Sequence, residues 1–400
     1  MSDQETISEC EPRQASTDSD SGEQEEHGQP SSLKRKHSDD EESADVPRAD
    51  NHTTVVASHY NQLKELGRGA RYRTKIFYMR NFNNWIKSVL ISKYVNQIRD
   101  KLRWGSPLRV MDMCCGKGGD LLKWANGNIT HLICTDIAEI SVQQCEERYQ
   151  AMRQRPDNSK LFTAEFFAAD ATLQRLREKY KDPSIDLNLV SCQFAFHYCF
   201  ESLKQAKFML KNAAECLKTD GYFIGTIPDA YEIMKRQRQA GSDSFGNDRY
   251  KITFLCDTEH PPLFGAKYNF QLDGVVDCPE FLVHFPTLVK LARKHGLKLI
   301  ECKRFGEVFD EFEKVGSCKT LMRQMQGLET FPGNSRDDYD RQQNKNEYQH
   351  AHEFVDQRTS RRGPIGTLSK SDWEVSTLYI YFAFQKVATS WNKNGEPVYD

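Results

Sequence analysis

The clearest chemical pattern in the sequence is a glycine-rich turn followed by a carboxylate. The segment MDMCCGKGGD occupies residues 111–120, and Asp136 lies twenty residues after Gly116, at the end of the next apolar run. Glycines let a backbone approach a ligand closely, and the helix that follows such a turn favours an anionic group at its N-terminus. An acid at the end of the following strand can accept hydrogen bonds from two ribose hydroxyls. The pattern predicts a pocket for a nucleoside-containing cofactor, against the alternative of an ordinary tight turn.

The spacing within this turn differs from that of a dinucleotide site. Dinucleotide sites use G-x-G-x-x-G to hold a pyrophosphate, whereas here Asp112 is followed by Cys114, Gly116 and Gly118 at alternate positions. This arrangement resembles the D/E-x-G-x-G-x-G pattern of class I methyltransferases, in which the acid helps to orient the methionine part of the cofactor.

A third pattern, QFAFHY at residues 193–198, follows another apolar run. Open α/β sheets bind ligands at the carboxyl ends of their strands. Gln193, His197 and Tyr198 are therefore candidate site residues, although a His beside a Tyr can equally be a core pair.

Alternating strand-like and helix-like segments surround these patterns. Such β-α alternation predicts an α/β fold with a mostly parallel sheet and helices on both faces. Strands are expected at residues 108–114, 131–136, 162–170, 185–194, 221–227, 297–305 and 377–385. Helices are expected from about residue 120 and at 78–101, 139–155, 173–180, 204–217 and 285–295. Residues 307–362 and a hairpin around 267–272 are interpreted as insertions in the C-terminal part.

Charge divides the chain of 400 residues into two parts. Residues 1–50 carry fifteen acidic and five basic side chains and no Phe, Trp or Tyr, a net charge of −10, and the remainder carries +8. Such a segment cannot build a core, so we expect a disordered tail at 1–50 and a folded catalytic domain at 51–400. The cluster Lys34-Arg35-Lys36 is a candidate nuclear-import signal, although a chance run of solvated charge would look the same. The basic remainder, which includes an arm at residues 68–73, suits an anionic partner such as nucleic acid.

Several classes of protein are disfavoured. No apolar run approaches the ~18 residues of a membrane span, and the opening MSDQETISEC is not a secretory signal. The twelve cysteines contain no C-x-x-C pair. Cys134, Cys192 and Cys302 lie in apolar, strand-like segments, so we interpret them as reduced core thiols and expect no metal site.

Six separated motifs, in order, resemble those of the eukaryotic mRNA cap guanine-N7 methyltransferases, especially the vertebrate members. The motifs are NFNNWIK at 81–87, CGKGGDLLKW at 115–124, TDIA at 135–138, FHY at 196–198, PEFLV at 279–283 and GTLSK at 366–370. The resemblance covers roughly residues 55–386. It implies a class I, Rossmann-like fold with a seven-stranded sheet, S-adenosylmethionine as cofactor, capped mRNA as substrate and the nucleus as location. It also implies a small RNA-binding activating subunit and a link to the RNA polymerase II capping machinery.

The resemblance further implies two sets of site residues. The cofactor contacts fall on Lys87, Cys114, Asp136, Asp170, Gln193 and Tyr198. The cap contacts fall on Asn83, Asn84, Lys117, Lys123, Arg148, His197, Glu280 and Tyr379. In the first set, Lys87 would neutralise the cofactor carboxylate and Asp170 would face the adenine edge.

The chemistry of the second set suits a cap. Lys117, Lys123 and Arg148 are cations suited to the triphosphate bridge and nearby sugar. Glu280 can accept hydrogen bonds from the N1–H and N2–H₂ edge of guanine and favours the cation that forms on methylation. His197 and Tyr379 can hold the purine by hydrogen bonding or stacking. Taken singly, each of these residues could also be a solvated surface group or a core side chain.

One position departs from the family pattern, which normally has Gly where this chain has Cys114. We expect a negative φ at Cys114, which would point the side chain away from the ligand. A positive φ would carry a Cβ penalty of ~1–2 kcal/mol.

Guanine N7 carries a lone pair and no proton, so in-line methyl transfer needs no general base. We therefore expect no acid–base residue, but orientation and electrostatic stabilisation by His197, Glu280 and Tyr379. Two alternatives remain open at this point. One is a class I methyltransferase with another substrate, and the other is a catalytically silent RNA-binding module, which only Cys114 supports.

Overall fold

The computed structural model of the chain describes residues 52–62, 74–156, 161–358, 363–393 and 397–399. The expected tail at residues 1–50, its Lys34-Arg35-Lys36 cluster and the basic arm at 68–73 lie outside the described residues. The division into a tail and a domain at 51–400 therefore stays a prediction. None of the described helices combines the length and the apolar character that crossing a bilayer requires.

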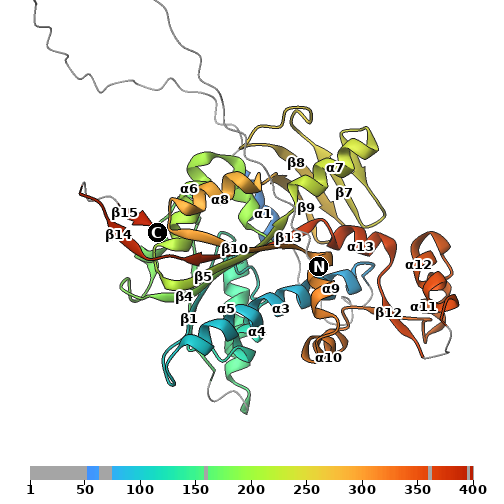
Figure 1. Cartoon of the computed structure of the whole chain (residues 1–400), viewed down its shortest axis with the longest axis horizontal. Helices are drawn as coiled ribbons and strands as arrows, with labels where there is room; N and C mark the ends of the chain where they lie inside the picture. The colour runs from blue at the N-terminus through green and yellow to red at the C-terminus, as the bar shows by residue number, and fades with distance from the viewer. Residues whose placement is uncertain (1–51, 63–73, 157–160, 359–362, 394–396, 400) are drawn as a thin grey trace, which may run out of the picture. The chain divides into compact units, whose positions relative to one another are not determined.

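A seven-stranded sheet runs through the centre of the described domain (Figure 1). Its strands are β1 (Arg109–Met113), β2 (His131–Asp136), β3 (Thr163–Ala168), β4 (Leu187–Gln193), β5 (Leu217–Pro228), β10 (Leu297–Arg304) and β13 (Tyr379–Lys386). Their order is β10-β13-β5-β4-β1-β2-β3, and β13 runs antiparallel to both of its neighbours. The predicted α/β class with a mostly parallel sheet is confirmed. The chain order reverses between β1 and β4, which is where sheets of this kind bind ligands.

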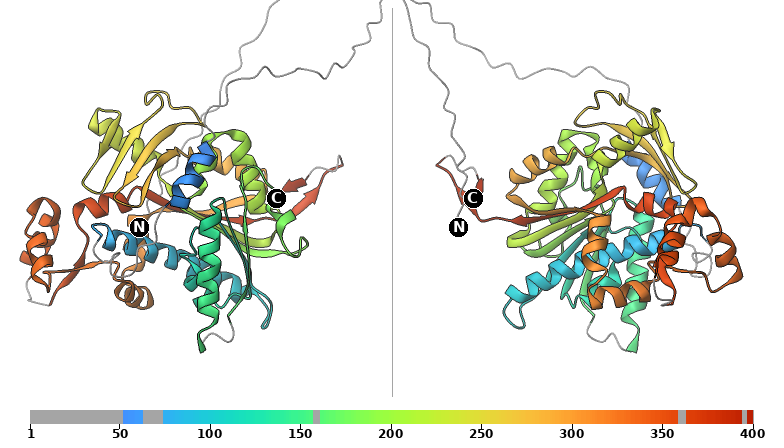
Figure 2. Two further views of the ribbon diagram at one scale, coloured as in Figure 1. Left: turned by 180° about the vertical axis from the view of Figure 1, so that it is seen from behind. Right: turned by 45° about the vertical axis from the view of Figure 1, so that its right-hand side comes forward.

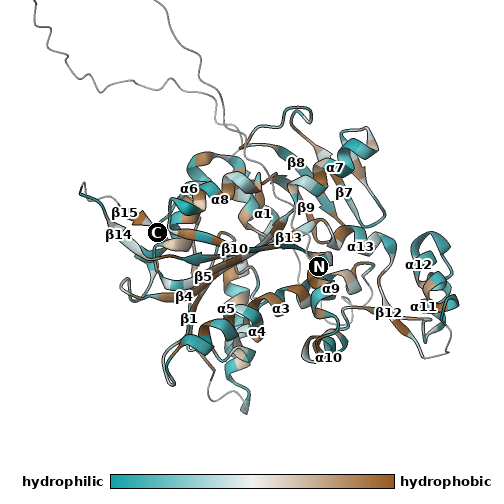
Figure 3. Ribbon diagram, viewed as in Figure 1, coloured by the Kyte–Doolittle hydropathy of each residue, from teal (hydrophilic) through white to brown (hydrophobic). Residues whose placement is uncertain are grey.

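Helices cover both faces of the sheet because successive strand residues point to opposite sides. Val110 belongs to the core on one face and Met111 to the core on the other. The first core also contains side chains of α3 (Phe77–Lys101), α4 (Leu121–Asn126) and α5 (Glu139–Arg153). The second contains side chains of α6 (Leu203–Ala214) and α8 (Phe285–Arg293). Figure 3 shows the apolar residues gathered along the strands and the inner sides of these helices.

Two insertions extend the C-terminal part, as predicted. The first is larger than the expected hairpin, because β8 (Lys267–Leu272) belongs to a four-stranded antiparallel sheet. Its other strands are β6 (Ser244–Gly246), β7 (Tyr250–Phe254) and β9 (Val276–Phe281), and α7 (Ala230–Ala240) precedes them. The second contains α9 (Phe305–Phe312), α10 (Gly316–Met325), β11 (Glu329–Phe331), α11 (Arg336–Gln342), α12 (Lys345–Asp356), β12 (Ile365–Thr367) and α13 (Lys370–Ser376).

Further short elements lie at the ends of the described chain. They are α1 (His52–Gln62) and the hairpin of β14 (Thr389–Trp391) with β15 (Pro397–Tyr399). Helix α1, blue in Figure 2, packs on β9 and α5.

Three local expectations were wrong. The third strand ends at Ala168, because the Asp170 carboxylate accepts hydrogen bonds from the backbone N–H and hydroxyl of Thr172 and begins a turn. The helix expected at 173–180 is only a 3₁₀ turn, η2 (Leu176–Lys179). The Asn212 side chain donates to the carbonyl of Gln174, which a helix at 173–180 would use for its own hydrogen bond, and such side-chain bonds compete with helix formation. Cys134 and Cys192 are buried thiols as expected, but Cys302 is exposed because it sits in the outermost strand of the sheet.

Candidate active site at the carboxyl edge of the sheet

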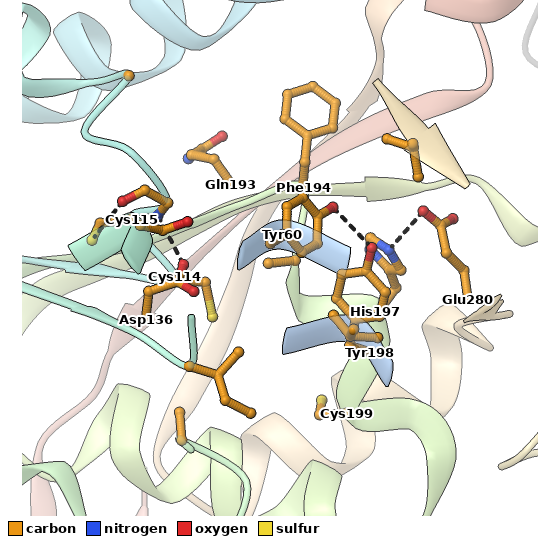
Figure 4. A pocket seen from close by; sticks show the side chains of 18 of the residues that line it. Tyr60, Cys114, Cys115, Asp136, Gln193, Phe194, His197, Tyr198, Cys199 and Glu280 are labelled. Carbon is orange, nitrogen blue, oxygen red and sulfur yellow. Dashed lines mark hydrogen bonds and ion pairs between the residues drawn. The ribbon is translucent and has the colours of Figure 1, made fainter. Parts of the chain in front are cut away.

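A cavity of about 470 Å³ lies at the carboxyl ends of β1, β2 and β4, within the usual size of small-molecule sites. Twelve of the fourteen predicted site residues line it: Asn83, Asn84, Lys87, Cys114, Lys117, Asp136, Asp170, Gln193, His197, Tyr198, Glu280 and Tyr379. Lys123 and Arg148 are not among the lining residues. Figure 4 shows Asp136 on one side of the pocket and Glu280 on the other. The two predicted sets therefore share one continuous cavity.

Asp136 joins the glycine-rich turn to the end of β2. Its carboxylate accepts hydrogen bonds from the backbone N–H of Gly116 at 2.8 Å and of Ala138 at 2.9 Å. Burial raises the pKa of the Asp136 carboxyl, and the two backbone N–H groups oppose that shift. Each carboxylate oxygen has a second lone pair, so the ionised group can still accept hydrogen bonds from a ligand.

The glycine-rich turn requires glycine for space as well as conformation. Gly118 has a φ of +72°, and a Cβ there would lie 2.7 Å from the Cys145 sulfur and 2.8 Å from Cδ1 of Leu121. The turn therefore lies directly against α4 and α5. A side chain at Gly118 would push the turn toward the cavity.

The expectation of a negative φ at Cys114 was wrong, because its φ is +62°. Phe194, directly after β4, has a similar φ of +58°. Both residues line the cavity at the point where the strand order reverses. Non-glycine residues with positive φ carry strain, which clusters at functional sites.

The strain at Cys114 can be measured by comparing two variants that both lack the thiol. At most positions Gly destabilises relative to Ala by roughly 0.5–1 kcal/mol. At Cys114 the Ala variant retains a Cβ penalty of ~1–2 kcal/mol, so Cys114→Gly should be more stable than Cys114→Ala. The free and ligand-bound proteins share this strain. The cofactor affinity of the Cys114→Gly variant should therefore differ from that of the unsubstituted protein by less than about tenfold, ~1.4 kcal/mol. Denaturant unfolding and calorimetric titration measure the two quantities, and a hundredfold gain in affinity for the Gly variant would show that the natural turn impairs binding.

The second side of the cavity holds a cluster of buried polar side chains. The Tyr268 hydroxyl donates to Oε2 of Glu280 at 2.7 Å. Nε2 of His197 lies 3.4 Å from Oε1 of Glu280, an ion pair when the ring is protonated. The Tyr198 hydroxyl lies 3.1 Å from that of Tyr60 and 3.4 Å from the sulfur of Cys278. Burial raises the pKa of Tyr198 and of Tyr268 well above the usual value, so both remain neutral hydrogen-bonding groups.

Lysines and acids near the turn pair with one another. Asp120 lies 2.8 Å from the ammonium nitrogens of both Lys87 and Lys123. Burial would raise the pKa of Asp120, but the charges of Lys123 and Lys87 outweigh it and lower that pKa. Lys123 thus reaches toward Asp120 and not into the cavity, and Arg148 lies on α5.

Asp112 is placed differently from the acid of the sequence pattern. It is buried and is not one of the cavity-lining residues. Its Oδ2 accepts a hydrogen bond from the indole N–H of Trp124 at 3.1 Å. Burial, and then the charge of Asp120, raise the pKa of Asp112. Asp112 therefore supports the turn on the side away from the cavity. Asp120, and not Asp112, lines the cavity.

Sequence reasoning missed several lining residues. His52 and Tyr60 come from α1, Arg80 from α3 and Phe270 from β8. Tyr268 was missed too, although its hydroxyl holds Glu280. No local pattern marks these positions, since each reaches the site through packing of a distant element.

The cavity fits S-adenosylmethionine by the chemistry of its walls. The Oε1 atom of Gln193 is buried beside the cavity without a hydrogen-bond partner among the described residues. The same is true of Oδ1 of Asn83 and Nδ1 of His197. Such atoms cost free energy unless a ligand or water pairs with them. The Asp136 carboxylate suits a ribose, and the apolar side chains of Ile137, Ala169 and Ala171 also line the cavity and suit a purine face.

Fold and site together define a class I methyltransferase. Residues 44–387 match the family of mRNA (guanine-N(7))-methyltransferase domains. The mRNA cap guanine-N(7) methyltransferase of Drosophila melanogaster is 58% identical over 87% of this chain and 80% of that protein. Its namesake from Caenorhabditis elegans is 39% identical over 86% of this chain and 90% of that protein. The chain thus belongs to the mRNA (guanine-N(7))-methyltransferase family, whose members methylate N7 of the cap guanosine of mRNA with S-adenosylmethionine as methyl donor.

Among solved structures, an S-adenosylmethionine-dependent methyltransferase from Clostridium acetobutylicum ATCC 824 is 11% identical, with a TM-score of 0.39 over 84% of this chain and 99% of that chain.

Proposed function

We propose that the cavity is divided between the methyl donor, on the side of Asp136, and the cap guanine, on the side of Glu280. The observation that supports this division is the single cavity with both residues in its wall. The cofactor contacts are then Lys87, Cys114, Asp136, Asp170, Gln193 and Tyr198. The cap contacts are Asn83, Asn84, Lys117, His197, Glu280 and Tyr379. We assign Lys123 and Arg148, which do not line the cavity, to contacts with the triphosphate and the nucleotide beyond it.

On the donor side, Asp136 accepts hydrogen bonds from the ribose hydroxyls while it holds the turn through Gly116. Gln193 offers its unpartnered Oε1 to a donor group of the ligand. Lys87, which pairs with Asp120 at 2.8 Å, attracts the carboxylate of the methionine part. Bound S-adenosylmethionine supplies a methyl group on a positively charged sulfur.

On the cap side, Glu280 accepts hydrogen bonds from the guanine edge. Tyr268 holds one oxygen of this carboxylate, which fixes the orientation of the other. No residue needs to remove a proton, because guanine N7 carries none. The chain's task is to align N7 with the donor, an effect worth up to ~7–11 kcal/mol in favourable cases. The Glu280 charge then stabilises the positive charge that moves onto the base.

The direct test is incubation of the protein with a labelled methyl donor and a short RNA that carries an unmethylated guanosine cap. Nucleoside analysis should find the label as 7-methylguanosine. Label in another nucleoside would contradict the assignment, as would label only in a protein or small molecule. Donor binding without any transfer would indicate a silent module.

Tyr268 is expected to act by positioning Glu280. Tyr268→Phe removes a hydrogen bond to a charged group, worth ~1.5–3 kcal/mol. We expect kcat/KM for capped RNA to fall about 10- to 100-fold by the same estimate, with unchanged affinity for S-adenosylhomocysteine. Tyr250→Phe is the matched control, because Tyr250 lies in the same small sheet, pairs with Arg236 and does not line the cavity. Equal loss in both variants would mean that the hydroxyl serves only folding.

We further propose that the protein acts in the nucleus, where caps are newly made, with a small RNA-binding activating subunit and the RNA polymerase II capping machinery as partners. The basic cluster Lys34-Arg35-Lys36 supports nuclear import. A reporter fused to residues 1–50 should therefore become less nuclear when these three residues are changed to Ala. An unchanged distribution in fluorescence microscopy would remove the import role.

A further inference from the structure

Three cysteines converge beneath the glycine-rich turn. The sulfurs of Cys115, Cys134 and Cys145 all lie within 4.8 Å of one another, and all three residues are buried. They come from three elements: the turn after β1, strand β2 and helix α5. Cys134 and Cys145 have no part in the proposed contacts with donor or cap.

The number of sulfurs restricts the kind of ion that the group could hold. Three sulfurs placed in a plane around one ion, each at about 2.3 Å from it, lie about 4 Å from one another. The three sulfurs here, all within 4.8 Å of one another, are already near that spacing. Within the described ranges, no fourth His, Cys, Asp or Glu ligand atom joins the group. Structural Zn²⁺ is almost always four-coordinate, whereas Cu⁺ is stable with three thiolates. Soft thiolate ligands also favour Cu⁺ over the harder cations.

The surroundings close the site but leave an approach to it. Gly118 packs so tightly on Cys145 that a Cβ there would lie 2.7 Å from the sulfur, which leaves no room for an added ligand on that side. Cys115 lines the large cavity, which provides an entry path. Arg148, three residues after Cys145 on α5, supplies positive charge beside the Cys145 sulfur.

We propose that Cys115, Cys134 and Cys145 form a binding site for a soft monovalent metal ion, with Cu⁺ as the ion that suits it best. Such an ion would tie β2 and α5 to the turn that carries Gly116 and Gly118. The inference rests on the position of these thiols and not on the proposed contacts with donor or cap.

The test uses the full chain, reduced and free of metal, in the absence of oxygen. Cu⁺ is added in the presence of a coloured Cu⁺ chelator, and one ion per chain should be withheld from it. Copper-edge X-ray absorption on the unsubstituted protein should then show three sulfur neighbours. Two sulfur neighbours, or nitrogen and oxygen neighbours, would overturn the proposal, and so would complete transfer of Cu⁺ to the chelator. The same titration with Zn²⁺ should show weaker binding, and tighter binding of Zn²⁺ would contradict the three-coordinate site.

Variants locate the bound ion. Cys134→Ser and Cys145→Ser should each lose at least tenfold in Cu⁺ affinity. Cys216→Ser should not, because Cys216 is equally buried but packs in the core on the opposite face of the sheet. Retained affinity for S-adenosylhomocysteine reports that a variant is folded. Equal Cu⁺ affinity in all three variants would place the ion elsewhere and overturn the proposal. Where a Ser variant does not fold, the sulfur count of the unsubstituted protein decides the question.

Discussion

Glu280→Gln is expected to reduce kcat for capped RNA by about 10²–10³-fold, the loss typical of removing one group that stabilises transition-state charge. The substitution keeps the shape of the side chain and an oxygen that can accept from Tyr268. It removes the negative charge and one acceptor for the guanine edge. The loss should therefore appear in the use of the cap, because the charge matters most as the base becomes cationic.

The measurement is a steady-state assay with capped RNA, together with calorimetric titration of S-adenosylhomocysteine. The affinity of the variant for S-adenosylhomocysteine should stay within about twofold of that of the unsubstituted protein. This is well below a tenfold change, which represents ~1.4 kcal/mol. A large loss of that affinity would place Glu280 on the donor side of the cavity and contradict the proposed division. Asp277→Asn is a suitable control, since Asp277 lies in the same strand and is exposed.

Asp136→Ala is expected to weaken the binding of S-adenosylhomocysteine about 100-fold, equivalent to ~2.8 kcal/mol. A hydrogen bond to a charged acceptor contributes ~1.5–3 kcal/mol, and this carboxylate would accept from two ribose hydroxyls. The variant also releases the backbone N–H groups of Gly116 and Ala138, which loosens the turn. Glu139→Ala is the control, because Glu139 is an exposed acid nearby that does not line the cavity.

The pH dependence gives a second measure of Asp136. Only the ionised carboxylate accepts hydrogen bonds with both oxygens, and burial raises its pKa above the usual value. Affinity should therefore be constant above that pKa and fall as the pH is lowered through it. The Asp136→Ala variant should lack this decline. Unchanged affinity in the variant, or an identical pH profile, would remove Asp136 from the donor site.

Structural features that depend on residues close together in the sequence were predicted well. The strand at residues 131–136 was predicted with the bounds that β2 has, and the long helix at 78–101 differs from α3 by one residue. The glycine-rich turn and Asp136 also met as expected. These features follow from apolar periodicity and from the short connection between adjacent parallel strands, both of which are local properties.

Long-range packing decided the rest. Tyr268 and Glu280 lie far along the chain from the turn, in a small sheet of which the sequence indicated only one hairpin. Tyr60 reaches the site because α1 packs on β9 and α5. No spacing rule relates these residues, since their distance in space depends on how separate elements pack.

The sequence by itself determined the fold class, the succession of strands and helices along the chain and the types of residue at the candidate site, because each follows from a local pattern or a motif. Only the tertiary structure decided the sign of φ at Cys114 and the meeting of Cys115, Cys134 and Cys145. The same holds for the ion pair between Asp120 and Lys87, which lies on α3. The three cysteines come from separate elements, so no local pattern relates them, and their sulfurs meet only because the turn packs closely on α5.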